Sequence, residues 1–205
     1  AWGHHHPGSM NRLERFRREC ESRGLDVDDV HADPVVQFAR WFDAVRDAGC
    51  YEPTAMVLAT VNEDAWPACR NVLLKGFDER GFVFYTNYTS AKAADIDATE
   101  RAALTFSWIE VRRQVRVVGH AARVSADESD AYFATRPRGS QLGAWASDQS
   151  AILSSRAELD ARYDEVETRF AGTTIPRPSH WGGYRVAPVI MEFWQGRENR
   201  LQDRL

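Results

Sequence analysis

The sequence predicts a mainly β protein of the α+β class, in which an antiparallel sheet closes into a barrel with helices packed at its ends. Connections between the strand-like segments are mostly short, and long helical crossovers do not alternate with strands, which disfavours a doubly wound parallel sheet. The GxGxxG fingerprint of dinucleotide-binding folds is also absent from the sequence. The strand-like segments are 56–61, 70–77, 82–88, 102–109, 114–124 and 184–194.

Length and charge narrow the classes of function. We expect residues 1–9 to be the remnant of a purification tag, followed by a single domain over residues 10–205. The formal net charge of −4 argues against nucleic acid as the main partner. No apolar run is long enough to span a bilayer, so we expect no membrane partner either.

Cysteine and histidine usage predicts a cytoplasmic protein without a metal site. The three cysteines are odd in number and widely spaced, which is typical of reduced thiols. The histidines outside the N-terminal residues are scattered and lack the spacing of zinc ligands.

Two helices are predicted before the first strand. Residues 11–24 are strongly charged and end at Gly24, and their few apolar positions predict a weakly packed helix. Asp33 can cap a second helix, in which Pro34 suits the first position. Apolar residues then recur every three to four positions up to Gly49, which predicts one buried face.

The segment 70–92 combines a predicted hairpin with polar residues suited to an anion. A strand between Arg70 and Lys75 turns at a polar stretch and returns as residues 82–88. Ser90 then stands where it would cap a helix over 91–98, with Lys92 in the first turn. A cation does not stabilise that end of a helix, which is already positive, so Lys92 is better explained by a bound phosphate. The alternative is a solvated hairpin with surface lysines.

Polar residues also follow a later strand. Alternation in residues 112–118 places Gln114 and Arg116 on one face and Val115 and Val117 on the other. This polar row suits either solvent or a ligand. Helices are expected at 126–135 and 154–171, the second charged all round and therefore at the surface.

The block YFATRPRGS (132–140) has the composition of a phosphate clamp. A phenol, a guanidinium and a hydroxyl, from Tyr132, Arg136 and Ser140, converge just past a predicted helix end. Arginine suits phosphate because its planar fork donates two parallel hydrogen bonds. The alternative is an ordinary basic loop in which Arg136 and Arg138 flank a proline.

Several long blocks, in the expected order, resemble the pyridoxine (pyridoxamine) 5′-phosphate oxidases. They are RNVLLKGFDERGFVFYTNYTSAK (70–92), RRQVRVVGHA (112–121), YFATRPRGSQLGAWASDQS (132–150), PRPSHWGGYRVAP (176–188) and MEFWQGRENRLQDRL (191–205). The resemblance covers nearly the whole chain after the first ten residues. That family consists of FMN-dependent homodimers with a split β-barrel fold, so the resemblance implies this fold, cofactor and assembly.

The resemblance also implies an activity and a set of site residues. The activity is oxidation of pyridoxine 5′-phosphate and pyridoxamine 5′-phosphate to pyridoxal 5′-phosphate, with oxygen as acceptor and hydrogen peroxide as product. Arg200 is implied to be catalytic by orienting the reacting carbon. FMN would lie at the dimer interface, held by residues of both subunits. The implied FMN-binding residues are Arg70, Val72, Leu73, Leu74, Lys75, Tyr85, Thr86, Lys92, Gln114, Gln149, Ser150, Trp194 and Arg204. The implied substrate-binding residues are Arg17, Lys75, Tyr132, Arg136, Ser140, Arg200 and Gln202.

Some positions depart from the family pattern. Cys20 stands where the family commonly has tyrosine, Gln202 where it has histidine, and Ala91 where it has an arginine near the FMN phosphate. The chain also ends at Leu205, before the final strand that members usually have. We expect phosphate capture to be preserved and recognition of the substrate ring to be altered. The alternatives are a paralogous FMN-dependent oxidase of another substrate, like the phenazine-pathway relatives, and a non-catalytic protein that binds flavin or pyridoxal phosphate.

Overall fold

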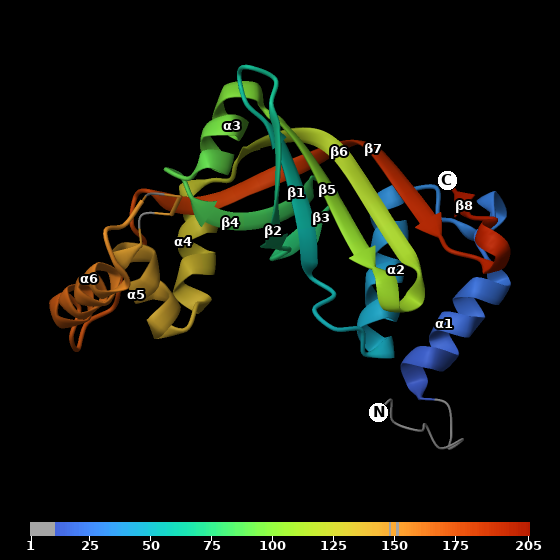
Figure 1. Cartoon of the computed structure of the whole chain (residues 1–205), viewed down its shortest axis with the longest axis horizontal. Coiled ribbons are helices and arrows are strands. Elements are labelled where there is room, and N and C mark those ends of the chain that lie inside the picture. The colour runs from blue at the N-terminus through green and yellow to red at the C-terminus, as the bar shows by residue number, and fades with distance from the viewer. Residues whose placement is uncertain (1–10, 148, 151) are drawn as a thin grey trace. The chain divides into compact units, whose positions relative to one another are not determined.

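Eight strands form one sheet in the described part of the protein, a computed structural model that covers residues 11–147, 149–150 and 152–205 (Figure 1). Neighbouring strands follow the order β2-β1-β5-β6-β7-β4-β3, and β8 pairs with β7. The pairings β3–β4, β4–β7 and β7–β8 are antiparallel, as the short connections predict. The strands are β1 (Ala55–Val61), β2 (Pro67–Leu73), β3 (Gly76–Asp78), β4 (Gly81–Asn87), β5 (Arg101–Trp108), β6 (Arg113–Arg123), β7 (Trp181–Gln195) and β8 (Asp203–Arg204).

Helix ends follow the capping signals in the sequence. Oδ1 of Asp33 accepts a hydrogen bond from the backbone N–H of Val35 at 2.8 Å, and Pro34 takes the first helical position of α2. Gly49 ends that helix in the left-handed conformation, at φ 85°. Ser90 caps α3, as predicted. The helices are α1 (Arg12–Arg23), α2 (Pro34–Ala48), α3 (Ala91–Thr99), α4 (Ala126–Thr135), α5 (Arg138–Ala146) and α6 (Arg156–Arg169).

The chain divides into two compact units. Unit 1 comprises the described residues up to Met56, Thr105–Val117 and Ile190–Leu205, and unit 2 comprises Val57–Leu104 and Val118–Val189. Strands β5, β6 and β7 each contribute residues to both units. The predicted tag remnant, residues 1–9, lies outside the described residues.

The core of unit 1 is aromatic. Phe38 of α2 is fully buried, and its ring lies 4.8 Å from that of Phe106 in β5, between centroids. Trp41, also on α2, meets Phe193 of β7 edge-on at 5.4 Å. Aromatic pairs of this kind contribute roughly 0.5–1.5 kcal/mol beyond the area they bury. The face of α2 predicted from its apolar spacing is therefore the face that packs on the sheet. Helix α1 is weakly packed, as expected, with Cys20 as its buried residue.

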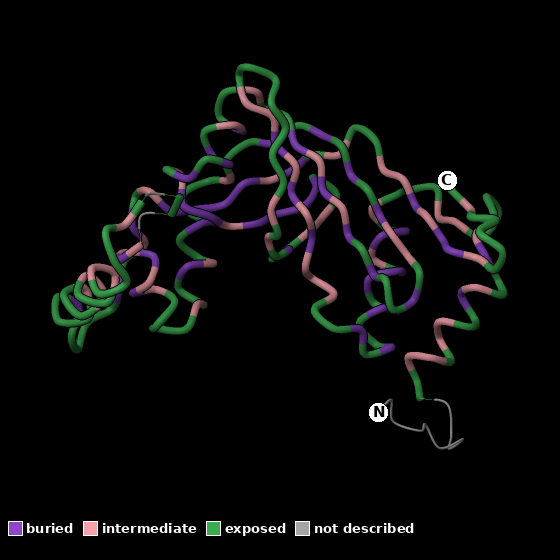
Figure 2. The backbone as a smooth tube through the Cα atoms, in the orientation of Figure 1, coloured by how far each residue is buried: buried purple, intermediate pink, exposed green. Residues whose placement is uncertain are grey.

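The core of unit 2 surrounds β4. Most residues of this strand are buried on both faces, including Phe82 and Phe84, both fully buried. Helices α5 and α6 pack against each other, and the tube of α6 in Figure 2 is exposed or intermediate along its length. None of the described residues of α6 is buried, which confirms the prediction of a surface helix.

One predicted strand, 70–77, was wrong because the chain breaks there into two strands with different partners. β2 ends at Leu73 and pairs with β1, whereas β3 pairs with β4. Between them, Lys75 N–H donates to Val83 O at 2.9 Å, which ties the break to β4. The β3–β4 turn requires Gly81, at φ 129°, where a Cβ would lie only 2.1 Å from Val186 O. Helix α5 was also not predicted, because it lies within a block interpreted as a binding loop.

Candidate active site

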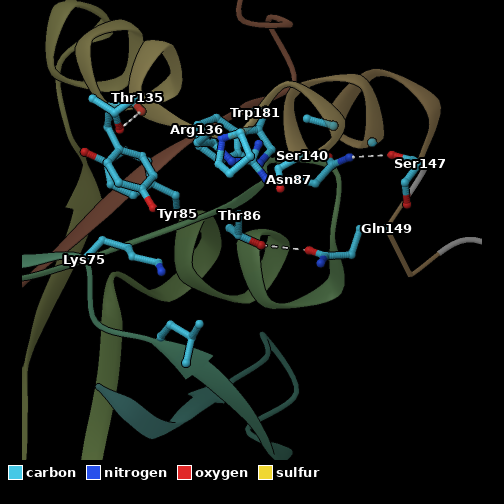
Figure 3. A pocket seen from close by; sticks show the side chains of 15 residues that line it. Lys75, Tyr85, Thr86, Asn87, Thr135, Arg136, Ser140, Ser147, Gln149 and Trp181 are labelled. Carbon is cyan, nitrogen blue, oxygen red and sulfur yellow. Dashed lines mark hydrogen bonds between the residues drawn. The ribbon is translucent and has the colours of Figure 1, made fainter. Parts of the chain in front are cut away.

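A pocket of about 550 Å³ in unit 2 collects many of the residues predicted to bind ligands (Figure 3). It lies among β4, α4, α5 and the segment that joins β2 to β3. Residues far apart in sequence therefore meet in one cavity. The predicted residues that line it are Leu73, Lys75, Tyr85, Thr86, Tyr132, Arg136, Ser140 and Gln149.

The junction of α4 and α5 sets the position of the predicted phosphate clamp. Arg136 ends α4 in an extended conformation (φ −71°, ψ 146°), which is the conformation that a following proline favours. The chain then enters α5, where Ser140 N–H donates to Pro137 O at 2.8 Å. Tyr132 lies one turn before the end of α4. A helix end, a proline and a helix start thus present a phenol, a guanidinium and a hydroxyl to one pocket.

Arg136 carries the clearest sign of a ligand in this pocket. Its Nη1 is buried and makes no hydrogen bond within the described residues. Burial also lowers the pKa of the Arg136 guanidinium, an effect that nearby Tyr132 partly opposes. An unsatisfied buried donor of a charged group is costly, so this atom fits an anion supplied from outside the chain.

The structure separates the two arginines of this loop, which sequence could not. Arg138 donates from Nη1 to Thr173 O at 3.0 Å and from Nη2 to Phe170 O at 2.7 Å. Its guanidinium therefore links α5 to the chain after α6 and is a structural group. Arg136, not Arg138, lines the pocket.

A second buried cation, Lys92, belongs to the set predicted to bind FMN. Its Nζ donates to Gln149 Oε1 at 2.8 Å and to Thr86 Oγ1 at 3.2 Å, and both partners are neutral. The side chain is buried, and this burial, followed by the charge of Arg70, lowers the pKa of the ammonium. Among the described residues the hydrogen-bond partners of this buried ammonium are all neutral, which suits it to a phosphate.

Other predicted FMN-binding residues of unit 2 lie near this lysine. Arg70 donates from Nη1 to Thr60 Oγ1 at 2.6 Å and to two backbone carbonyls, so the chain itself satisfies that atom. Ser150 accepts a hydrogen bond on Oγ from Ala91 N–H, at 3.4 Å, at the start of α3. Leu74 is buried and Val72 is half-buried. These two apolar residues could contribute backbone hydrogen-bonding groups or side-chain packing to a bound ligand.

Unit 1 holds the remaining predicted cofactor residues. Trp194 of β7 is the register partner of Arg204 in β8, so the structure brings these two together. Nε of Arg204 lies 3.6 Å from Glu192 Oε2. Gln114 is the second residue of β6 and is half-buried, while Val115 beside it is fully buried, as the alternation predicted.

The predicted catalytic residue lies on a loop of unit 1. Arg200 has a left-handed backbone, at φ 59°, directly after Asn199 at φ 56°. Consecutive non-glycine residues in this region store strain, and such strain is concentrated at functional sites. Gln202 closes the loop, because its Oε1 accepts a hydrogen bond from Arg197 N–H at 2.9 Å. Gln202 therefore has a loop-forming contact, which sequence reasoning did not foresee.

Two residues of α1 bear on the predicted substrate site. Arg17 has a buried Nε without a hydrogen-bond partner in the described chain, consistent with a ligand-binding group. Cys20, which stands where the family commonly has a tyrosine that contacts the substrate, is 4% exposed in unit 1, and burial raises the pKa of its thiol. Direct contact of Cys20 with a substrate is therefore not supported by this structure.

Trp181 is a pocket residue that the sequence did not single out. It lines the cavity beside Arg136 and Tyr132, although its block, HWGG, had been quoted only for its resemblance. The usable signal was a large aromatic residue directly before a Gly-Gly pair. Asn87 also lines the pocket and donates to Ser147 O at 3.2 Å, which ties β4 to the end of α5.

No group of three or more His, Cys, Asp or Glu residues among those that the structure describes could hold a metal ion. None of the described helices is long and apolar enough to cross a membrane.

Comparison with known proteins was made for sequence and for fold. The sequence model described as "Pyridoxamine 5′-phosphate oxidase" matches residues 43–170, and that described as "Pyridoxine 5′-phosphate oxidase C-terminal dimerisation region" matches residues 181–205. A pyridoxine/pyridoxamine 5′-phosphate oxidase of Rubrobacter xylanophilus is 60% identical over 198 residues, covering 97% of this chain and 91% of that protein. Its counterpart in Acaryochloris marina is 52% identical over 197 residues, covering 96% and 90%.

Two solved structures support the fold. The crystal structure of PhzG from Burkholderia lata 383, in complex with tetrahydrophenazine-1-carboxylic acid, matches with a TM-score of 0.83 and 32% identity, over 88% of this chain and 90% of that chain. A pyridoxamine 5′-phosphate oxidase-related, FMN-binding protein of Nostoc punctiforme matches with a TM-score of 0.60 and 16% identity, over 82% and 95%. The predicted fold class is thereby confirmed. The chain belongs to the pyridoxine/pyridoxamine 5′-phosphate oxidase family, a family of oxidoreductase enzymes with the split β-barrel fold.

Proposed function

We propose that this protein oxidises pyridoxine 5′-phosphate and pyridoxamine 5′-phosphate to pyridoxal 5′-phosphate, with FMN as cofactor and dioxygen as acceptor. The observation that carries the proposal is the buried, unsatisfied Nη1 of Arg136 in a pocket that Lys75, Tyr132 and Ser140 also line. Two cations, a phenol and a hydroxyl match the oxygens of a phosphate ester. The names of relatives that are 52–60% identical support the same substrate class.

The proposed oxidation consumes dioxygen with either substrate, and also water with pyridoxamine 5′-phosphate. Pyridoxine 5′-phosphate loses two electrons and two protons to become the aldehyde, and dioxygen takes them up as hydrogen peroxide. Pyridoxamine 5′-phosphate loses the same electrons to give an imine, which water hydrolyses to the aldehyde and ammonia. Bound FMN would supply the two-electron acceptor between substrate and oxygen.

The residues near Lys92 fit FMN. The buried ammonium has two neutral partners, Thr86 and Gln149, and lies in the field of Arg70. Since Arg70 already faces Asp95, with Nη2 and Oδ2 3.8 Å apart, an added phosphate would chiefly compensate the charge of Lys92. Lys92 and Arg70 would hold the FMN phosphate, and Gln114 would bond the polar edge of the flavin ring. Trp194 and Arg204, paired across β7 and β8, are the FMN contacts that we propose in unit 1.

Arg200 is the residue that we assign to the reacting centre. Its guanidinium would orient the substrate carbon that is oxidised and stabilise charge that develops there. The left-handed backbone at Arg200 supports this role, since sparsely populated backbone conformations are concentrated at functional sites. Arg17, with its unsatisfied Nε, and Gln202 would bind the part of the substrate away from the phosphate.

We also propose a cytoplasmic homodimer with FMN at the interface. The match of residues 181–205 to a dimerisation region supports this assembly. In unit 2 a largely apolar groove of about 410 Å³, lined by Val61, Ala103, Val118 and Val189 among others, is suited to a second copy. The cysteines are unpaired, which agrees with a reducing compartment.

A paralogous oxidase of a phenazine precursor is the second candidate. The solved PhzG structure, with a TM-score of 0.83, favours it. Its 32% identity is well below the 52–60% identity to relatives named as pyridoxine/pyridoxamine 5′-phosphate oxidases, which is why we rank it second. A protein that only binds flavin or pyridoxal phosphate would leave the flavin oxidised with every substrate.

The test is an anaerobic titration of the FMN-loaded protein with pyridoxine 5′-phosphate, followed by the visible absorbance of the flavin. We expect bleaching, and recovery with one hydrogen peroxide per flavin when air is admitted. Pyridoxine without phosphate should bleach far less, and so should the Arg136→Met variant with the phosphate ester. Arg138→Met is the matched control, because it removes the same charge from the same loop outside the pocket. A flavin that stays oxidised with the phosphate esters but bleaches with tetrahydrophenazine-1-carboxylic acid would replace the proposal by its rival.

A further inference from the structure

Three aromatic rings form one layer along the wall of the pocket. The rings of Tyr85 and Tyr132 stack with centroids 4.0 Å apart and planes at 13°, and those of Tyr85 and Trp181 stack at 5.4 Å and 10°. They come from β4, α4 and the start of β7. Gly183 permits the layer, because a Cβ there would lie 2.8 Å from Cε1 of Tyr85. The absence of a side chain at Gly183, two residues after Trp181, therefore leaves space for the Tyr85 ring that stacks on Trp181.

Arg136 extends this layer. Its Cζ lies 4.5 Å from the centroid of the Trp181 ring, and Figure 3 shows the two side chains next to each other in the pocket. A guanidinium over an indole is attracted by the negative face of the ring, more strongly where water is excluded. Since Nη1 of Arg136 has no hydrogen-bond partner in the described chain, this stacking is a principal restraint on the guanidinium.

Trp181 is well placed to impose such a restraint, because its own position is fixed. Its backbone N–H donates to Pro178 O at 3.1 Å, and its carbonyl accepts from Nη1 of Arg177 at 2.6 Å. It pairs with Asn87 in the register of β4 and β7, and it is 7% exposed. Backbone and burial together leave the indole little freedom.

We propose that Trp181 is a positioning residue that preorganises the phosphate clamp, holding the Arg136 guanidinium directly and the Tyr132 phenol through Tyr85. The inference rests on the proposed function, because it assigns a role in capturing the same phosphate ester. It predicts that phosphate binding requires the planar guanidinium of Arg136 stacked on the Trp181 ring, and that a positive charge at position 136 is not sufficient. It also predicts that the clamp is formed before the ligand arrives, which lowers the entropy cost of binding.

A purely structural role for Trp181 must be separated from this one. Trp181 belongs to a core cluster with Phe170, and its removal would also loosen packing. Phe170→Leu is therefore the control, since the ring of this residue shares the cluster and packs against Trp145, whereas Arg136 lies over the rings of Phe133 and Trp181. The informative variants are Trp181→Leu, which removes the ring, Trp181→Phe, which keeps a smaller one, and Arg136→Lys, which keeps charge and loses the planar group.

The experiment measures binding of pyridoxal 5′-phosphate and of inorganic phosphate to the FMN-loaded protein by calorimetry, beside the melting temperature of each variant. We expect Trp181→Leu to weaken both by about 5- to 30-fold, which corresponds to about 1–2 kcal/mol at 1.4 kcal/mol per tenfold. Trp181→Phe should lose less. Binding of pyridoxal, which has no phosphate, should change less than twofold. In the Arg136→Lys background the effect of Trp181→Leu should shrink to less than half, because the stacked partner is already lost.

The outcomes distinguish the two proposals. Additive effects of Trp181→Leu and Arg136→Lys, or a loss with Phe170→Leu as large as that with Trp181→Leu, would overturn the role of Trp181. Coupling seen with inorganic phosphate, but no binding of pyridoxal 5′-phosphate by the wild-type protein, would sustain that role and overturn the proposed substrate. Failure of the wild-type protein to bind either probe would overturn both.

Discussion

Replacing Lys92 by methionine should weaken FMN binding strongly while leaving the stability of the cofactor-free protein almost unchanged. Methionine has nearly the length of lysine and can fill the same buried space. The ammonium in the wild-type protein is buried, makes two hydrogen bonds to neutral groups, and has a pKa lowered by burial and then by the charge of Arg70. It is therefore a cation placed for a ligand that the chain itself does not supply.

The magnitudes follow from these contacts. Loss of two hydrogen bonds from a charged donor costs about 1.5–3 kcal/mol each, whereas removal of a buried charge relieves a desolvation penalty of several kcal/mol. The bond from Thr86 Oγ1 to Gln149 Oε1, at 2.7 Å, survives the substitution. The net change in unfolding free energy without FMN should therefore stay within about 1 kcal/mol. Loss of one charged contact to phosphate should weaken FMN binding by about 10- to 150-fold.

The assay compares FMN titration, followed by flavin fluorescence, with urea unfolding of the FMN-free protein. Ala91→Arg, which restores the cation common in the family, should shift FMN affinity in the opposite direction. The pKa of Lys92 is lowered from 10.5, so the folded protein bears the free-energy cost of burying the charged ammonium at neutral pH. This cost is relieved as the pH rises towards 10.5, because the folded protein loses the proton before the unfolded chain does. The unfolding free energy of the wild-type protein should therefore increase relative to that of Lys92→Met in alkali. A loss of unfolding free energy as large as the loss of FMN binding energy would refute the reasoning.

Three further predictions concern titration, thiols and assembly. Burial raises the pKa of Tyr85 to about 12 from 10.0, so the neutral phenol stabilises the fold fully below pH 10. The unfolding free energy of the wild-type protein should fall relative to that of Tyr85→Phe between pH 10 and 12. Parallel curves of unfolding free energy against pH for the two proteins would contradict this. Cys69 is exposed, whereas Cys20 and Cys50 are buried. A thiol reagent should therefore modify Cys69 quickly and the two buried thiols only on unfolding. Cys69→Ser should abolish the fast phase of the reaction. Val118→Asp should place a charge in the apolar groove of unit 2. Burying that charge in a dimer interface is unfavourable, so the mass measured by light scattering should shift towards that of the monomer. An unchanged mass would show that the groove is not part of the dimer interface.

Local elements were largely predictable because their signals lie within a few residues. The capping residues Asp33 and Ser90, and the alternation around Val115, each matched the structure. The failures have a common cause. Whether residues 70–77 form one strand or two depends on which strands they pair with, and β1 and β4 compete for them only in the folded sheet.

The site shows the same division. The sequence alone determined the family, and it supplied the residue types of the proposed phosphate clamp and of the proposed anion site at Lys92, because these are patterns of residue type and order. Only the tertiary structure decided that Arg136 faces the pocket while Arg138 binds backbone carbonyls, and that Trp181 stacks on Arg136. Those contacts join residues 32 to 45 positions apart in the chain. The direction of each side chain is set by packing between elements and not by its neighbours in the chain.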